Sequence, residues 1–193
     1  IDGLGLDYYA YMPTLLKMSA EGFYKPVKAV MPTVTNVNNV SVCCGAWPDE
    51  HHISANSYYD CSTEEPVYMN SAELIKRDTI FQKAKKHGLK SALLTSKKKT
   101  LELFYKDTTL AIAAETASPE LIARYGIPPD IYSSEVNYWL WKVAIDIIRN
   151  QPEIRVIYVH TTDYPMHRWA PGEAESIEHL TIMDSLIREA HDA

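Results

Sequence analysis

The run RVIYVHT at residues 155–161 consists mainly of β-branched and aromatic residues, and a polar stretch follows it at once. Such a short apolar run is typical of a buried strand. A second run of this kind, KSALLT at residues 90–95, follows an amphipathic segment at 79–87 that ends before Gly88. Strands that alternate with helical segments favour a parallel sheet with helices on its faces. The sequence therefore predicts an α/β fold with a central, mostly parallel sheet flanked by helices.

Helical signals lie on both sides of these two strands. Proline near a first turn, apolar residues three and four apart, or glycine just past an end mark the expected helices. These are residues 13–20, 40–44, 79–87, 118–125, 134–150 and 174–190. Residues 23–30 are expected to form a short or edge strand, because Pro26 interrupts them, and residues 46–60 a loop. Neither an internal repeat nor a linker is visible, so residues 1–193 are predicted to have no separate second domain.

The composition is that of an ordinary folded protein, with 46% hydrophobic and 23% charged residues. Lys+Arg 19 against Asp+Glu 25 gives a net charge of -6, which argues against a nucleic-acid binder or an anionic-membrane binder. No run approaches the roughly 20 apolar residues of a membrane span, and no secretory signal pattern is visible. The cysteines, Cys43, Cys44 and Cys61, fit neither a disulfide framework nor a zinc motif. We therefore expect reduced thiols in a cytoplasmic protein.

The sequence begins and ends within patterns that are typical of a strand and a helix. Asp2-Gly3 resembles the carboxyl end of a strand whose body would precede Ile1, and Ala193 lies just beyond an apolar pattern that is still helical. We therefore expect a fold that is truncated at both ends.

Polar side chains follow each expected strand. Asp2, Lys97 and Asp163 all come directly after one, and ligands of open α/β sheets collect at the carboxyl ends of strands. This convergence predicts a functional site there. His51 and His52 are interpreted as structural, because adjacent loop residues rarely point to one ion.

Each of these features also has a simpler interpretation. Asp163 and His167 are four residues apart and could bind zinc, or they could be a capping carboxylate and an unrelated surface imidazole. Thr35 before an expected helix could be a metal-activated nucleophile or a plain helix cap. The lysines of residues 83–99 could form an anion-binding edge or a solvated loop.

Taken in order, the motifs resemble the type I phosphodiesterase/nucleotide pyrophosphatase branch of the alkaline phosphatase superfamily. Within that branch the sequence is most similar to the phosphonoacetate hydrolases. The resemblance covers nearly all residues and is carried by Asp2-Gly3, by TNVNN at 35–39, by SANSYYD at 54–60, by TSKKK at 95–99 and by TTDYPMHRWAPGEAES at 161–176. It implies the N-terminal part, residues 1–193, of an alkaline-phosphatase-like catalytic domain.

The resemblance implies a centre of two zinc ions at the carboxyl ends of the sheet. Asp2 and Thr35 would bind one ion, with Thr35 as the nucleophile. Asp163 and His167 would bind the other. Two metals about 4 Å apart can clamp an in-line displacement at phosphorus.

The resemblance also implies a small anionic phosphonate as the substrate. Asn56 matches the asparagine that binds a phosphoryl oxygen, and Lys97 and Lys99 match a lysine pair associated with the substrate carboxylate. The implied reaction cleaves the P–C bond of phosphonoacetate through a phosphothreonine intermediate. Cations on the carboxylate would stabilise the enolate-like leaving group. The resemblance leaves a homodimer open.

The sequence departs from the family pattern in three places. His52 stands where the family usually has glycine, and Lys98 stands where an acidic residue is more familiar. The further zinc ligands of the family, an Asp-His pair and a later histidine, have no counterpart, so we expect these 193 residues to be inactive alone. Two alternatives therefore stay open: a phosphodiesterase or nucleotide pyrophosphatase acting on phosphate esters, and a non-catalytic fragment with incomplete metal sites.

Overall fold

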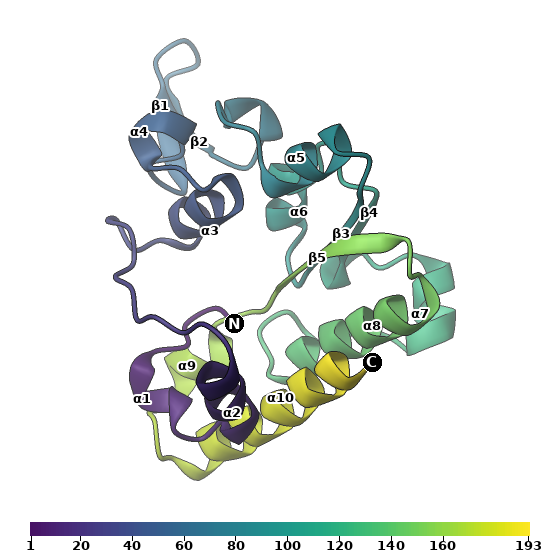
Figure 1. Cartoon of the computed structure of the whole chain (residues 1–193). Helices are drawn as coiled ribbons and strands as arrows, with labels where there is room; N and C mark the ends of the chain where they lie inside the picture. The colour runs from purple at the N-terminus through teal and green to yellow at the C-terminus, as the bar shows by residue number, and fades with distance from the viewer.

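The computed structural model describes residues 1–193 and contains a central sheet of three parallel strands. They are β3 (Lys90–Thr95), β4 (Leu110–Ala113) and β5 (Ile154–His160), with β3 between the other two (Figure 1). Leu93 pairs with Ala111 of β4 and with Tyr158 of β5. Because the strands are parallel, their carboxyl ends meet at one edge of the sheet. The predicted α/β fold is confirmed, and both runs quoted above form strands.

Helices cover both faces of this sheet, because side chains along a strand alternate between the faces. Ala92 and Leu94 pack with α8 (Glu135–Asn150) in one apolar cluster. Leu93 belongs to a second cluster on the opposite face, with side chains of α3 (Thr35–Cys44), α5 (Ile80–Lys86) and α6 (Lys98–Phe104). All three β3 side chains are fully buried. The sheet is therefore the middle of three layers.

A third cluster joins α10 (Ala174–Asp192) to α1 (Leu6–Tyr9) and α2 (Pro13–Glu21), and Met12 and Leu180 are fully buried in it. The buried carboxylate of Asp184 accepts hydrogen bonds from the backbone N–H groups of Thr14, at 3.0 Å, and Leu15, at 3.2 Å. These amides lie in the first turn of α2, where no helical partner exists for them. Asp184 therefore caps α2 from the far end of the chain.

The remaining elements are short. They are α4 (Pro48–His51), β1 (Ser57–Asp60), β2 (Glu65–Tyr68), α7 (Pro119–Tyr125) and α9 (Tyr164–Arg168), with single 3-10 turns at Ala72–Leu74 and Ala114–Thr116. β1 and β2 pair antiparallel as a hairpin that projects from the rest of the molecule (Figure 1). None of the helices has both the length and the apolar character that crossing a membrane requires.

Local sequence explains where several helices start and stop. The Thr79 hydroxyl accepts from the Gln82 N–H, and the Gln82 side chain accepts from the Thr79 N–H, which makes a capping box before α5. The Ser118 hydroxyl caps α7. Gly45 adopts φ +61 after α3, the left-handed geometry that commonly ends a helix.

Two expectations from the sequence are wrong. Residues 23–30 form no strand, because no other strand lies beside them to pair with their backbone and Pro26 lacks an N–H. Residues 46–60 are not a plain loop, since they contain α4 and β1. The short helix expected from Thr35 is confirmed, and it includes the five residues before the apolar run at 40–44.

Candidate functional site

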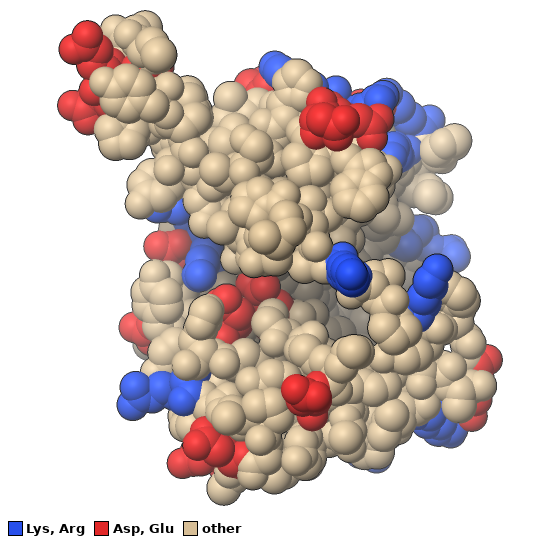
Figure 2. All heavy atoms as spheres, turned by 90° about the vertical axis from the view of Figure 1, so that its left-hand side faces the viewer, with Lys and Arg blue, Asp and Glu red and all other residues tan.

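A cavity of about 630 Å³ opens where β5 ends and α3 begins. Its lining brings together three of the predicted site residues, Asp2, Thr35 and Asp163, and adds His160. Figure 2 shows the molecule hollowed between an upper and a lower part, with acidic atoms inside the hollow and basic atoms at its edges. Asp2 and Asp163, which the sequence placed at strand ends, therefore lie at the same cavity.

The chain brings Asp2 and Asp163 to the same cavity, with Gly3 packed against Asp163. The Asp2 N–H donates to the Thr161 hydroxyl at 3.0 Å, which fixes the N-terminal segment to the residue after β5. Gly3 follows with φ +75, and a Cβ atom there would lie 3.1 Å from the Asp163 Cβ. Only glycine combines this backbone conformation with so close an approach. The two carboxylates are both about a quarter exposed, at 24%.

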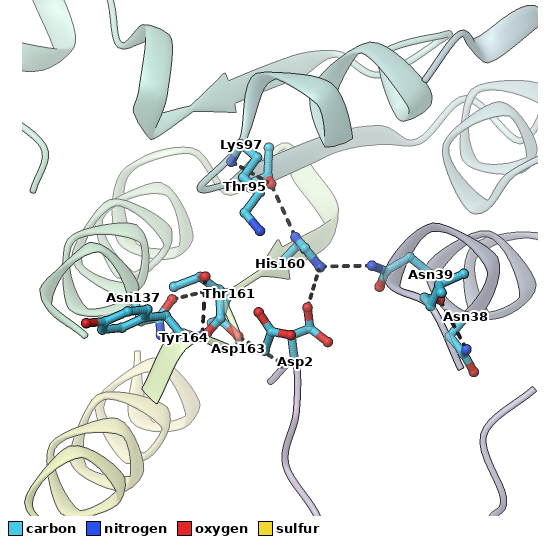
Figure 3. Close-up of polar contacts among 12 residues, drawn as sticks. Asp2, Asn38, Asn39, Thr95, Lys97, Asn137, His160, Thr161, Asp163 and Tyr164 are labelled. Atoms are coloured by element: carbon cyan, nitrogen blue, oxygen red, sulfur yellow. Dashed lines mark hydrogen bonds and ion pairs between the residues drawn. The ribbon is translucent and has the colours of Figure 1, made fainter. Parts of the chain in front are cut away.

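Asp2 is held in its charged form. Burial opposes its ionisation, but contact with His160, then the charge of the amino terminus, and last the charge of Lys97 outweigh this effect and keep the pKa of Asp2 below its usual value. The His160 Nε2 lies 3.5 Å from the Asp2 Oδ2. Figure 3 shows the Lys97 amine pointing from the end of β3 toward this group of side chains. The ionised carboxylate is the form that binds a cation.

Thr35 is the first residue of α3 and its hydroxyl is not used to cap the helix. Val34 occupies the N-cap position with extended φ −89 and ψ 150, and no side-chain cap bond is formed. The simpler interpretation of Thr35 as a helix cap is therefore wrong. Its half-buried side chain lines the cavity, at the helix end whose dipole favours an oxyanion.

Asparagines of the TNVNN motif tie the start of α3 to its surroundings. Asn38 accepts from the Val30 N–H at 2.8 Å and donates to the Val30 carbonyl at 3.1 Å, so it fastens the segment that leads to Thr35. The Asn36 amide donates to the carbonyl of Met69, next to the hairpin, at 3.2 Å. The motif is therefore a set of anchors around the threonine.

Asp163 and His167 form the second predicted pair. Asp163 occupies the N-cap position of α9 without a side-chain cap bond, so its carboxylate is free to face the cavity. The His167 Nε2 lies 2.9 Å from the Asp163 Oδ2, and the His167 side chain is 78% exposed. Asn137 of α8 holds the preceding turn, since it exchanges two hydrogen bonds with the backbone of Thr162, at 2.8 and 3.1 Å.

None of the predicted substrate-binding residues, Lys97, Lys99 and Asn56, lines the cavity itself. The Lys97 Nζ lies 5.6 Å from the centre of the Tyr132 ring. The Lys99 Nζ is 3.6 Å from the centre of the Tyr68 ring, on the hairpin. Asn56 is exposed before β1 and does not line the cavity. The structure therefore brings Lys97 to the site, and it leaves Asn56 and Lys99 outside the cavity.

The site residues fit zinc in kind. Asp2 with Thr35 offers two oxygens, and Asp163 with His167 offers an oxygen and a nitrogen, which zinc accepts. However, no cluster of three or more His, Cys, Asp or Glu side chains that could hold a metal ion is formed. Each pair therefore supplies two of the three protein ligands that are usual at a catalytic zinc. His51 is structural as expected, because Ser41 and the Ile53 N–H occupy both of its ring nitrogens, whereas His52 is exposed.

Sequence reasoning did not identify His160, Asn39 or Tyr158. The Asn39 amide contacts both of the other side chains, at 2.9 Å to the His160 Nε2 and 2.7 Å to the Tyr158 hydroxyl. A signal was present, because Tyr158 and His160 are two residues apart in a strand and so point to the same face. However, tyrosine and histidine also occur in buried strands without a functional role, so this spacing did not mark the two residues as part of a site.

Comparison with known proteins gives a family. The family model described as type I phosphodiesterase/nucleotide pyrophosphatase matches residues 1–193. Human ectonucleotide pyrophosphatase/phosphodiesterase family member 1 is 25% identical over 199 residues, which are 97% of this chain and 20% of that protein. Venom phosphodiesterase 2 of Crotalus adamanteus is 25% identical over 197 residues, which are 95% of this chain and 22% of that protein. The chain thus spans about a fifth of the length of these curated relatives.

Solved structures give a similar result. Phosphonoacetate hydrolase from Sinorhizobium meliloti 1021, in complex with phosphonoformate, matches with a TM-score of 0.88 and 27% identity over 99% of this chain and 51% of that chain. Murine ectonucleotide pyrophosphatase/phosphodiesterase 5, in complex with AMP, matches with a TM-score of 0.69 and 13% identity over all of this chain and 50% of that one. This second likeness concerns the fold alone. The chain spans about half the length of both structures.

Proposed function

The chain belongs to the type I phosphodiesterase/nucleotide pyrophosphatase family, and we propose from this that it is the N-terminal part of the catalytic domain of a zinc-dependent phosphonoacetate hydrolase. The expected alkaline-phosphatase-like architecture, a parallel sheet between helices, is confirmed by the structural matches. One observation carries the functional proposal: Asp2, Asp163 and the uncapped Thr35 line the same cavity at the end of the sheet.

In the proposed reaction, the Thr35 hydroxyl gives its proton to solvent water, and its oxygen attacks the phosphorus of phosphonoacetate. The P–C bond breaks, and its electron pair leaves with the carboxymethyl group, which takes a proton from water to become acetate. A second water then attacks the phosphothreonine, which releases phosphate and restores the Thr35 hydroxyl. The start of α3 would favour the threonine oxyanion, because unpaired backbone N–H groups gather there.

The ligands of zinc would be the two pairs at the cavity. Zinc bound by Asp2 with Thr35 and by Asp163 with His167 supplies positive charge that lowers the pKa of the hydroxyl and neutralises phosphoryl oxygens. The chain's own part is to keep Asp2 ionised, chiefly through His160, and to bring the two carboxylates to one cavity.

Lys97 would bind the substrate carboxylate and stabilise the charge that develops as the P–C bond breaks. Lys99 would bind the same carboxylate once the Lys99 amine moves away from the Tyr68 ring. Asn56 would bind a phosphoryl oxygen from the base of the hairpin. A cytoplasmic location and a homodimer remain predictions from the sequence.

Two other functions are open, and each has an observation in its favour. The curated relatives with about 25% identity are phosphodiesterases, which favours a phosphate ester as the substrate. The absence of any cluster of three metal-binding side chains favours a non-catalytic protein with weak metal affinity.

Phosphate release from phosphonoacetate with added zinc tests the proposal. The intact enzyme, of which residues 1–193 would be the N-terminal part, should release phosphate, and Thr35→Ala should lower its kcat by at least roughly 10³-fold, because the nucleophile is lost. Thr33→Ala is the matched control, since Thr33 lines the same cavity two residues earlier, and it should stay within about 3-fold of the wild type. Cleavage of a nitrophenyl phosphodiester alone would favour the phosphodiesterase, and no cleavage of either substrate would favour the non-catalytic protein.

A further inference from the structure

Asn39 joins the helix that carries Thr35 to the end of β5. Its side-chain oxygen accepts from the Tyr158 hydroxyl at 2.7 Å, and its nitrogen lies 2.9 Å from the His160 Nε2. Tyr158 and His160 are alternate residues of β5, so both side chains leave the strand on the side of α3. Figure 3 shows Asn39 reaching His160 from α3, with Asp2 at the same ring nitrogen and Thr95 at the other.

The two partners of this amide are themselves fixed. The Tyr158 ring meets Phe81 and Phe104 at centroid distances of 6.3 and 6.5 Å. Burial raises the pKa of the Tyr158 hydroxyl, which therefore stays protonated and donates. His160 is 5% exposed, and its Nδ1 lies 3.3 Å from the Thr95 hydroxyl at the end of β3.

The position of Asn39 in α3 relates this contact to the site. Asn39 follows Thr35 by four residues, so the two side chains lie on the same face of the helix, one turn apart. The ring that contacts Asn39 also lies 3.5 Å from Asp2 through the same nitrogen. One amide thus links the helix of the proposed nucleophile to the residue beside a proposed zinc ligand.

We infer that Asn39 is a positioning residue that sets the place of Thr35 relative to Asp2. This inference rests on the proposed function of Thr35. An amide suits the task because its oxygen accepts from the Tyr158 hydroxyl while its nitrogen contacts the His160 ring. Rates depend steeply on such placement, since a shift of about 1 Å in reacting groups can cost about 100-fold.

The test compares Asn39→Ala with Ser41→Ala in the zinc-loaded protein. Ser41 is the matched control, because its hydroxyl anchors the same helix to His51 at 2.9 Å, away from β5. Both variants should lower the urea midpoint to a similar extent. Only Asn39→Ala should lower kcat on phosphonoacetate, by about 100-fold with KM within about 2-fold. Equal kcat values in the two variants would overturn the inference.

Two further measurements keep the test decisive. His160→Gln retains a side-chain amide that can hydrogen-bond to Asn39. It should keep more kcat and zinc affinity than His160→Ala, whose zinc affinity by calorimetry should fall about 10-fold or more. Hydrogen exchange of the Asn38 amide, which closes the first turn of α3 onto the Val34 carbonyl at 3.2 Å, should speed up about 10-fold in Asn39→Ala and not in Ser41→Ala. If the wild type releases no phosphate, the proposed function fails while exchange still decides the inference, and equal exchange rates overturn it.

Discussion

Replacing Lys97 with alanine should slow turnover of phosphonoacetate far more than turnover of a substrate without a carboxylate. The Lys97 amine points toward the carboxylates of the cavity and lowers the pKa of Asp2. A charge-assisted hydrogen bond contributes about 1.5–3 kcal/mol, which corresponds to about 10- to 150-fold in kcat/KM. Lys99 must first leave the exposed Tyr68 ring, at a cost of about 0.5–1 kcal/mol. Lys99→Ala should therefore cost less, about 5- to 30-fold.

The assay measures kcat/KM for phosphonoacetate and for nitrophenyl phosphate with the same zinc-loaded preparations. Lys98→Ala is the control, because the exposed Lys98 amine pairs with Glu102 at 3.5 Å, and it should change either value less than about 2-fold. Equal losses on the two substrates after Lys97→Ala would refute the carboxylate role. A larger loss after Lys99→Ala than after Lys97→Ala would refute the assignment of Lys97 as the main contact.

Three further predictions concern stability, each measured as the free energy of unfolding in urea. Burial lowers the pKa of His179 from 6.5 to about 4. Because the unfolded chain binds the proton more readily, the free energy of unfolding falls as the pH drops from 6.5 toward 4. The loss should be about 2 kcal/mol between pH 7 and pH 5. His179→Gln should lack that part of the pH dependence. His52 has φ +67, a left-handed geometry that favours glycine, and His52→Gly should stabilise the protein by about 0.5–1 kcal/mol. Asp184→Ala should destabilise it by about 2 kcal/mol, because it uncaps α2, whereas Asp192→Ala, an exposed change in the same helix, should cost less than about 0.5 kcal/mol.

Contrary results are easy to recognise. The same pH slope in the wild type and in His179→Gln would exclude the buried imidazole as its source. A loss of stability in His52→Gly would mean that the imidazole makes contacts worth more than the backbone strain. Equal effects of the two aspartate variants would show that Asp184 does not cap α2.

Much of the site was predictable because strand ends are visible in a sequence. The runs before Lys97 and Asp163 are apolar and end abruptly, and parallel strands bring such ends together. Asp2 was placed by the same rule, although no strand precedes it in this chain. Asp2 and Asp163 line one cavity, as this rule predicts, and Thr35 joins them there from the start of α3.

Other features depend on contacts that no local pattern reports. The start of α3 at Thr35 is fixed by Asn38, which bonds to the backbone of Val30. The link from Asn39 to His160 joins residues 121 positions apart. The strand expected at 23–30 failed for a related reason, because a strand requires a neighbour, and hydrophobic pattern alone does not supply one.

The proposed mechanism requires that Thr35 attack the phosphorus of phosphonoacetate. Its most direct test is to mix the zinc-loaded protein with phosphonoacetate, stop the reaction in acid within milliseconds to seconds, and locate any added phosphoryl group by peptide mass spectrometry. If Thr35 is the nucleophile, we expect a phosphoryl group on Thr35 that disappears as phosphate is released and is absent from Thr35→Ala. Phosphate release without phosphorylated Thr35, or with the phosphoryl group on another residue, would contradict it.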